Sequence, residues 1–291
     1  MGRLGVIALF LFGVGCGGGD DDDDVAVDAR PRAVDATADV VDAEVAGDAR
    51  SPDATPAGMV LYGIVSGRLV TIDTTTGDAS DVGAVGLEIT RATWDEGSGT
   101  VYGVYDNTIA PKLATIDLCT GAATHAVNLT IPGNLIDGFD FEAASGTLYA
   151  SVTADGNYPP DHRTEQLVTI DPVTGRSTVV ANYTGTLTDG DVLLLDLPQP
   201  LAIDTDTSNS TVTLYDLSLA SAAATNERTT GPPLTVFETV HQGVIYALGG
   251  DGAIEGQIVT LDPTTGVPTA VGGSHVPADV AALFSAPACA P

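Results

Sequence analysis

Positive charge is scarce in this chain. Its 291 residues contain 10 Lys and Arg against 39 Asp and Glu, which gives a formal net charge of -29 at pH 7. A nucleic-acid-binding protein needs a positive surface, and this chain would repel phosphate groups. Anionic lipid surfaces are disfavoured for the same reason. The composition therefore predicts no nucleic-acid partner.

Familiar catalytic and cofactor motifs are missing as well. The sequence contains no GxSxG elbow, no P-loop and no dinucleotide fingerprint. Its histidines fall in different parts of the chain without the spacing of a metal site, and they are His125, His162, His241 and His275. Long helical periodicity is absent too. After residue 58, β-branched runs of four to eight residues alternate with turn residues, which predicts an all-β domain.

No apolar run is long enough to span a bilayer as a permanent helix. Residues 4–14 form an apolar run after the single basic residue Arg3. The run leads into the sequence Gly13-Val14-Gly15-Cys16. This pattern is typical of a signal peptide, and its end resembles the bacterial lipobox. The resemblance implies that Cys16 is lipidated, with Gly17 matching the outer-membrane class. We therefore expect residues 1–16 to be a lipoprotein signal peptide. The alternative is cleavage elsewhere with an unmodified Cys16.

Large apolar side chains are rare in residues 17–58. This segment opens with glycines and the run Asp20 to Asp24, and it continues with Ala, Val, Asp and Pro. Such a composition buries too little surface to offset its ordering entropy. We expect a disordered Asp/Ala-rich linker between the membrane anchor and a domain covering residues 59–291.

That domain is built from a repeated hairpin motif. Near-copies of one sequence recur at intervals of roughly 45 residues, the spacing of propeller blades. They read TIDTTTG from Thr71, TIDLCTG from Thr115, TIDPVTG from Thr169 and TLDPTTG from Thr260, with an eroded copy, TLYDLSLAS, from Thr213. In the third copy Asp171 can accept amide hydrogen bonds and Gly175 can adopt positive φ, so a strand should end there and turn back.

Each hairpin is preceded by a segment that supplies two more strands, so one repeat makes a four-stranded blade. The first repeat lacks its front strand and begins directly at residues 60–64. The missing strand appears at the other end of the chain, in residues 278–284. We therefore predict a five-bladed β-propeller closed by N- and C-terminal strands in one blade, which leaves no open sheet edge.

The segments LYG…LVTIDTTTG and FDFEAASGTLYA…LVTIDPVTG resemble the repeats of bacterial secreted β-propellers of the NHL and YVTN type. The resemblance covers residues 59–284 and implies the fold. These propellers include adhesins, scaffolds, sugar binders and hydrolases, so the resemblance leaves the function open. Five blades also depart from the six or seven usual in those groups.

Two cysteines remain once Cys16 is assigned to a lipid. Cys119 lies in the hairpin turn of the second blade, and Cys289 follows the closing strand of the first. The first and third strands of a blade run in the same direction, so both cysteines should leave the same face in neighbouring blades. An even pair in an exported domain favours a disulfide. The alternative is two unpaired thiols.

One constellation of oxygen-bearing residues is a candidate site. The residues that begin the five innermost strands should surround one mouth of the central channel, and they are Thr90, Asp137, Asp189, Thr235 and Asp279. Three carboxylates and two hydroxyls could bind a hard cation such as calcium. Alternatively, each side chain hydrogen-bonds the backbone of a neighbouring blade. The residue types leave both possibilities open.

Two functions fit these features. The first is a lipid-anchored, non-enzymatic binding module of the cell envelope, with a protein or glycan ligand held by loops such as residues 154–165. The second is a propeller hydrolase that acts on a sugar or lactone through the channel carboxylates. We favour the first, because propeller loops act as interaction surfaces whether or not chemistry is added.

Overall fold

The computed structural model describes residues 58–289 except for 108–109, 134, 154–164, 185–186, 188–189, 207–210, 230–233, 251–253 and 277–278. The predicted signal peptide, the lipobox and all of the linker but Gly58 lie outside the described residues. So does the loop 154–164. Across the described part of the chain, no helix has the length and apolarity that a membrane crossing requires.

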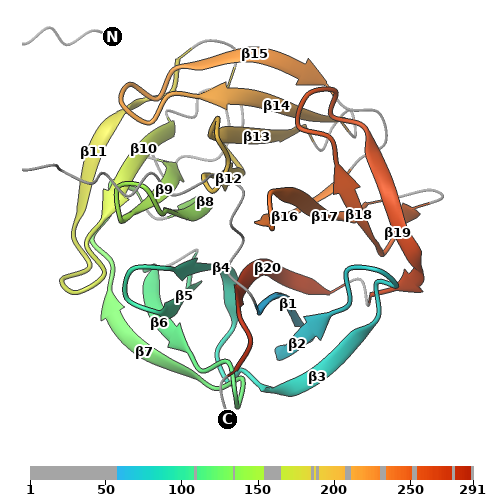
Figure 1. Cartoon of the computed structure of the whole chain (residues 1–291). Helices are drawn as coiled ribbons and strands as arrows, with labels where there is room; N and C mark the ends of the chain where they lie inside the picture. The colour runs from blue at the N-terminus through green and yellow to red at the C-terminus, as the bar shows by residue number, and fades with distance from the viewer. Residues whose placement is uncertain are drawn as a thin grey trace, which may run out of the picture. The chain divides into compact units, whose positions relative to one another are not determined.

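Five antiparallel four-stranded sheets surround a common centre in the described residues, as predicted for a five-bladed β-propeller (Figure 1). From centre to rim, blade I contains β20 (Val280–Pro287), β1 (Met59–Val65), β2 (Arg68–Ile72) and β3 (Ala79–Ala84). Blade II contains β4 (Ile89–Asp95), β5 (Thr100–Tyr105), β6 (Lys112–Ile116) and β7 (Ala123–Asn128). Blade III contains β8 (Leu135–Glu142), β9 (Thr147–Thr153), β10 (Glu165–Ile170) and β11 (Ser177–Asn182). Blade IV contains β12 (Val192–Leu194), β13 (Leu201–Asp206), β14 (Thr211–Leu217) and β15 (Ala224–Thr229). Blade V contains β16 (Leu234–His241), β17 (Val244–Gly249), β18 (Gln257–Leu261) and β19 (Pro268–His275).

The two ends of the domain close the ring in blade I. β20 is the innermost strand of that sheet and pairs antiparallel with β1, with Tyr62 opposite Phe284. Their rings stack with centroids 5.5 Å apart, and both side chains are buried. This pairing confirms the predicted closure by N- and C-terminal strands.

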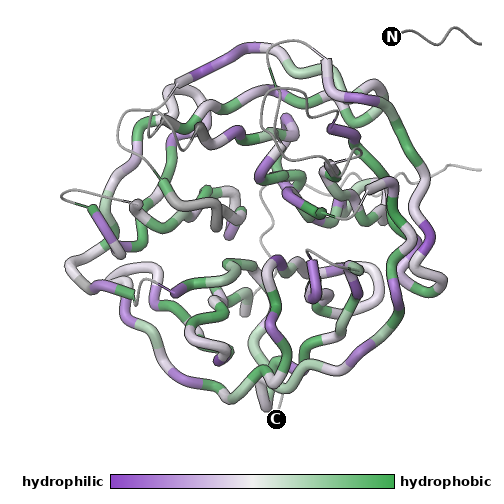
Figure 2. Tube along the Cα trace, turned by 180° about the vertical axis from the view of Figure 1, so that it is seen from behind, coloured by the Kyte–Doolittle hydropathy of each residue, from purple (hydrophilic) through white to green (hydrophobic). Residues whose placement is uncertain are grey.

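Hydrophobic side chains fill the spaces between neighbouring blades. Between blades I and II, for example, Tyr62 and Phe284 pack in one cluster with Ile89 and Val101. The trace coloured by hydropathy shows hydrophobic stretches in every blade, alternating with hydrophilic ones around the rim (Figure 2). Each blade therefore buries both faces, and burial of apolar surface is the main force that holds the ring together.

The repeated motif forms the hairpin between the third and fourth strands of a blade. In blade III, Asp171 Oδ1 accepts hydrogen bonds from the amides of Val173 and Thr174, at 2.9 and 3.2 Å. The Thr174 hydroxyl donates to the other oxygen of Asp171 at 2.7 Å, and Gly175 has φ +70°. The same turn is built on Asp73, Asp117 and Asp262.

These hydrogen bonds lower the pKa of the turn carboxyls. Backbone amides are the largest cause at Asp73, Asp117 and Asp262, and the Thr174 hydroxyl is the largest at Asp171. The oxygens of these exposed side chains are therefore engaged in turn formation.

The eroded fourth turn begins later than the motif alignment predicts. The alignment starts this copy at Thr213, yet the hairpin closes between Ser218 and Ala222, whose amide donates to the Ser218 carbonyl at 2.8 Å. Ser218 thus stands in the place of the turn aspartate, and Ala222, with φ +52°, in the place of the glycine. The predicted register was wrong by three residues because both residues that mark the turn are substituted.

A register shift bends every outer strand. All five pairings between third and fourth strands contain one, a feature that increases local twist. The outer strands consequently follow the rim, with the end of one beside the hairpin of the next blade (Figure 1). After β7, the Thr130 amide donates to the Gly175 carbonyl at 2.7 Å, and Ser177 donates back to Thr130 at 3.1 Å. Backbone hydrogen bonds therefore join blades II and III.

The hairpin glycines permit this close approach between blades. We predict that Gly175→Ala costs about 3 kcal/mol of unfolding free energy, whereas Gly146→Ala in the same blade costs about 1 kcal/mol. Both residues have positive φ, but a Cβ at Gly175 would lie 2.1 Å from the carbonyl oxygen of Asn128, and one at Gly146 would meet nothing within 4 Å. Urea unfolding followed by fluorescence of the single Trp94 measures both values. Equal losses would show that this contact between blades is unimportant.

Candidate functional site

The innermost strands begin on one side of the ring, which we call the strand-start side. Of the predicted site residues, Thr90 and Thr235 are the second residues of β4 and β16, Asp137 is the third residue of β8, and Asp279 directly precedes β20. Asp189 and the side chain of Thr235 lie outside what the structure describes.

Thr90 and Asp137 occupy equivalent bulges. In β4 the register skips Thr90 between Ile89 and Arg91, and in β8 it skips Asp137 between Ile136 and Gly138. Bulges re-aim side chains and are common next to functional sites.

Blade I departs from this pattern. Its register skips Ala281, because Val280 and Ala282 pair with consecutive residues of β1. Asp279 therefore lies two residues before the position of Asp137, and its exposed carboxylate accepts a hydrogen bond from Ser66. The ring of five strand-start residues stays a prediction, with Asp279 offset along its strand relative to Asp137. A two-residue slip preserves the alternation of faces, so the sequence pattern could not reveal it.

Asp137 belongs to a buried polar cluster that the sequence did not indicate. Its side chain accepts a hydrogen bond from the Thr153 hydroxyl at 2.8 Å, and the same hydroxyl lies 3.4 Å from Glu165. Glu165 is 3% exposed and also accepts hydrogen bonds from Ser151 at 3.2 Å and from the Gly190 amide at 2.6 Å. The cluster joins blade III to the segment that enters blade IV. No local motif marks it, because its members are distant in sequence.

The described residues contain no group of three or more His, Cys, Asp or Glu side chains placed to hold a metal ion. Thr90 donates to the Val104 carbonyl at 3.3 Å, and the Asp137 carbonyl accepts from Arg91 Nε at 2.6 Å. The first contact lies within blade II and the second uses the backbone of Asp137, so neither is the predicted bond from a strand-start side chain to the backbone of a neighbouring blade. A calcium site that includes Asp189 and Thr235 stays a prediction.

The opposite side of the ring, the strand-end side, carries an acid with a perturbed pKa. Asp140 on β8 accepts hydrogen bonds from the Thr93 hydroxyl at 2.7 Å and from the Leu195 amide at 2.8 Å. Asp140 is partly exposed. The surrounding protein raises the pKa of its carboxyl to about 6, and desolvation is the largest cause. Asp196, which follows Leu195 and is exposed, also has a raised pKa through partial desolvation and the charge of Glu96.

An open groove of about 880 Å³ lies on the strand-end side of blade III. Its lining includes Asp95, Phe141, Leu148, Ile170, Asp171 and Arg176. Asp95 and Asp171 already accept hydrogen bonds from their own turns. The exposed guanidinium of Arg176 has no hydrogen-bond or ion-pair partner within the described residues. This groove therefore combines an apolar part with a cation that is free to meet a ligand.

A serine and a histidine meet between blades V and I. His241 Nδ1 lies 2.8 Å from Ser285 Oγ, and burial lowers the pKa of the imidazole. An activated serine needs a base that is itself oriented by a third group. No carboxylate contacts His241 among the described residues. The geometry supports a packing role for this pair.

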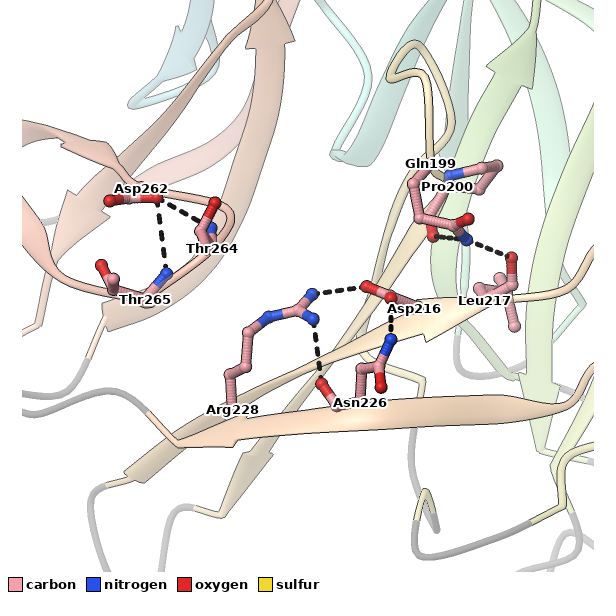
Figure 3. Close-up of polar contacts among 9 residues, drawn as sticks. All are labelled: Gln199, Pro200, Asp216, Leu217, Asn226, Arg228, Asp262, Thr264 and Thr265. Carbon is pink, nitrogen blue, oxygen red and sulfur yellow. Dashed lines mark hydrogen bonds and ion pairs between the residues drawn. The ribbon is translucent and has the colours of Figure 1, made fainter.

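Figure 3 shows a polar cluster on the outer strands of blade IV. Arg228 Nη2 lies 2.8 Å from Asp216 Oδ1, and Asn226 donates to the other oxygen of Asp216 at 2.5 Å. Arg228 also donates to the Asn226 carbonyl at 2.9 Å. These contacts brace the β14–β15 pair at its register shift, so this arginine is committed to structure.

Cys119 and Cys289 form a disulfide, with their Cα atoms 5.1 Å apart. Cys119 lies in the turn after β6 of blade II, and Cys289 lies two residues after β20. The bond ties the end of the closing strand to the neighbouring blade.

The described chain is thus a five-bladed β-propeller built from sequence repeats. A family described as "Repeat of unknown function (DUF6923)" matches residues 54–191, which include the strands from β1 to β11. This match supports the predicted repeats, while the likeness to NHL and YVTN repeats stays a prediction. No match was found among curated proteins.

Solved structures resemble this fold at low sequence identity. A chain of a nidogen/laminin complex is 12% identical, with 80% of this chain and 100% of that chain covered and a TM-score of 0.53. TolB from Acinetobacter baumannii is 16% identical, with 75% and 53% covered and a TM-score of 0.44. Hydrazine synthase from Kuenenia stuttgartiensis is 11% identical, with 67% and 57% covered and a TM-score of 0.40. The first of these supports the propeller architecture.

We predict that replacing both Cys119 and Cys289 by serine lowers the free energy of unfolding by about 2–4 kcal/mol, because the cross-link restricts the unfolded chain. The amides of β20 should also exchange faster with solvent. Denaturant titration and hydrogen exchange measure the two effects. A reductant should reproduce them in the wild-type protein and have no effect on the double variant. Unchanged stability would show that strand pairing alone closes the ring.

Proposed function

We propose that this protein is a lipid-anchored β-propeller of the cell envelope that acts as a non-enzymatic binding module for a protein or glycan. The groove on blade III is the observation that carries the binding role. Its volume falls within the range of ligand pockets. The groove also contains the guanidinium of Arg176, which has no partner among the described residues. Arg68, Lys112 and Arg228, by contrast, are paired with carboxylates.

The chemistry of the groove favours binding over reaction. A hydrolase that uses two carboxyls needs one acid with a raised pKa beside an ionised partner. In the groove, hydrogen bonds lower the pKa of Asp171. Asp95 is buried and accepts three hydrogen bonds from Gly97 and Ser98. The groove therefore supplies fixed polar contacts and an apolar surface.

The second candidate, a hydrolase of sugars or lactones, has one observation in its favour. Asp140 combines a pKa of about 6 with the neighbouring carboxylates of Asp196 and Glu96. However, its oxygens accept three hydrogen bonds from the protein, which leaves little capacity for a substrate. A binding role needs neither a free acid oxygen nor a paired carboxylate, so it fits this geometry better than hydrolysis does.

The proposed address rests on the N-terminal sequence. The apolar run of residues 4–14, the lipobox-like end at Cys16 and the acidic linker form the pattern of an outer-membrane lipoprotein. A fatty acyl anchor would make contact with the membrane possible despite the net charge of -29.

The binding role is tested with the purified full chain on a glycan array and in cross-linking capture from envelope extracts, each with and without calcium. We expect a glycan or protein ligand whose affinity falls about tenfold in Arg176→Ala, because a charged hydrogen bond is lost. Arg68→Ala, which removes an exposed arginine paired with Asp81, is the matched control and should bind normally. Absence of any ligand, or turnover of a sugar or lactone, would contradict the proposal.

The anchor is tested by growing bacteria that express the chain with a clickable fatty acid. We expect the wild-type protein to be labelled and to sediment with membranes, and Cys16→Ser to lose both properties, because the cysteine sulfur carries the lipid. Labelling that persists in Cys16→Ser would place the lipid elsewhere, and an unlabelled wild-type protein would remove the anchor from the proposal.

A further inference from the structure

The outer hairpin of blade III differs from its repeats at residues that the turn does not need. Asp171 and Gly175 form this turn, as their counterparts do in blades I, II and V. The residue after the glycine position is Arg176 here, and in the other hairpins it is Asp78, Ala122, Ala223 or Val267. At the tip of the blade III hairpin, Val173 is 84% exposed. Turn formation explains neither side chain, because the other hairpins form without them.

Arg176 is the exposed cation of this hairpin, and it lines the groove together with Pro172, Thr174 and Thr178. Its guanidinium has no hydrogen bond or ion pair to the residues that the structure describes. Acidic residues outnumber basic ones by 39 to 10 in this chain, so an arginine without an acidic partner is conspicuous. A guanidinium pairs with a carboxylate through two parallel N–H donors. The side chain therefore suits a ligand that brings its own carboxylate.

The rim strand of blade III, β11, has an unprotected outer edge (Figure 1). Proteins commonly protect edge strands from further pairing with charged residues, proline or bulges. All five rim strands share a register shift, so the difference lies in their residues. The other rim strands contain Asp81 on β3, His125 on β7, Glu227 and Arg228 on β15, and Pro268 on β19. The sequence of β11, STVVAN, contains no charged residue, histidine or proline.

The middle of β11 has backbone groups available on this edge. The Ser177 amide points outward, because it donates to the Thr130 carbonyl at 3.1 Å. Alternate residues of a strand share an edge, so the N–H and C=O of Val179 point outward as well. Just beyond β11, the Thr184 amide donates to the Ala222 carbonyl at 3.4 Å. Neighbouring blades thus contact both ends of the edge, and within the described residues no backbone hydrogen bond occupies it at Val179.

We propose that the outer hairpin of blade III binds an extended, acidic segment of a partner protein, which adds as a strand at Val179 and places a carboxylate on Arg176. This inference rests on the proposed binding function and assigns it a protein ligand. Thr178 lines the groove and directly precedes Val179, so the added strand would lie beside the groove. In this mode of recognition, main-chain hydrogen bonds provide affinity and side-chain contacts provide specificity. The exposed Val173 adds an apolar contact at the tip.

The first test selects ligands for the full chain from a displayed library of random linear peptides. We expect the bound peptides to share an acidic residue flanked by β-branched or aromatic residues, which favour extended strands. Arg176→Glu should bind these peptides about 100-fold more weakly, because attraction becomes repulsion, and should regain about tenfold when lysine replaces the acidic residue of the peptide. Val267→Glu changes the equivalent, 57% exposed position of blade V and should bind like the wild type. Selected peptides without an acidic residue, or equal binding by Arg176→Glu, would overturn the proposal.

The second test concerns the strand edge. Val179→Pro removes the outward N–H without breaking a hydrogen bond to β10, and it should weaken peptide binding about tenfold. Val179→Thr keeps both the N–H and a β-branched side chain, so it should bind normally. In the wild-type chain, the Val179 amide should exchange with solvent at least about tenfold more slowly when a selected peptide is bound. This measurement decides the question if Val179→Pro does not fold, and unchanged exchange would overturn strand addition.

The outcomes separate this inference from the proposed function. If a glycan binds with an affinity that depends on Arg176 and no linear peptide binds, the binding function stands and the peptide inference is wrong. If sedimentation shows a concentration-dependent dimer that Val179→Pro abolishes, a second copy of this chain occupies the edge, and the inference of a separate partner is wrong. If neither peptides, glycans nor envelope extracts yield a ligand, both proposals are wrong.

Discussion

The pairing of β20 with β1 is the constraint on which the rest of this structure depends. A propeller blade buries both of its faces against neighbours, so a ring left open would expose two apolar faces at once. Here the closing strand comes from the opposite end of the chain, and Phe284 completes the cluster that Tyr62 shares with blade II. Ring closure and core formation are therefore the same event, and the disulfide reinforces it at the end of β20.

The repeated hairpins explain how so acidic a chain forms a ring of close-packed blades. Each turn aspartate satisfies amides of its own loop, while glycines allow the backbone of the adjacent blade to approach. Gly83 and Gly121 meet in this way between blades I and II, and Gly272 meets Thr76 between blades V and I. The turn aspartates therefore define the hairpins, and the same hairpins position the neighbouring blade.

Much of the fold could be predicted because its determinants are local or terminal. Asp171 and Gly175 mark their turn, and the unmatched strands at the two ends identify the closure. The features that the sequence did not reveal depend on contacts between distant segments of the chain. A two-residue offset that preserves the face separates Asp279 from the position of Asp137, and the loss of both marker residues hid the turn at Ser218. The acidic groups that matter, Glu165 and Asp140, are defined by donors from neighbouring blades, which a linear pattern does not reveal.

These polar contacts are unevenly distributed around a ring of similar repeats. Blade I contributes stacked aromatic rings to its boundary with blade II, whereas blade III carries Glu165, Asp140 and most of the groove lining. Buried polar groups require complete hydrogen bonding, so they cost more to maintain than apolar packing. Apolar contacts, by contrast, occur at every boundary between blades. Blade III therefore combines buried carboxyl groups with the groove, and a test of the proposed ligand binding should begin there.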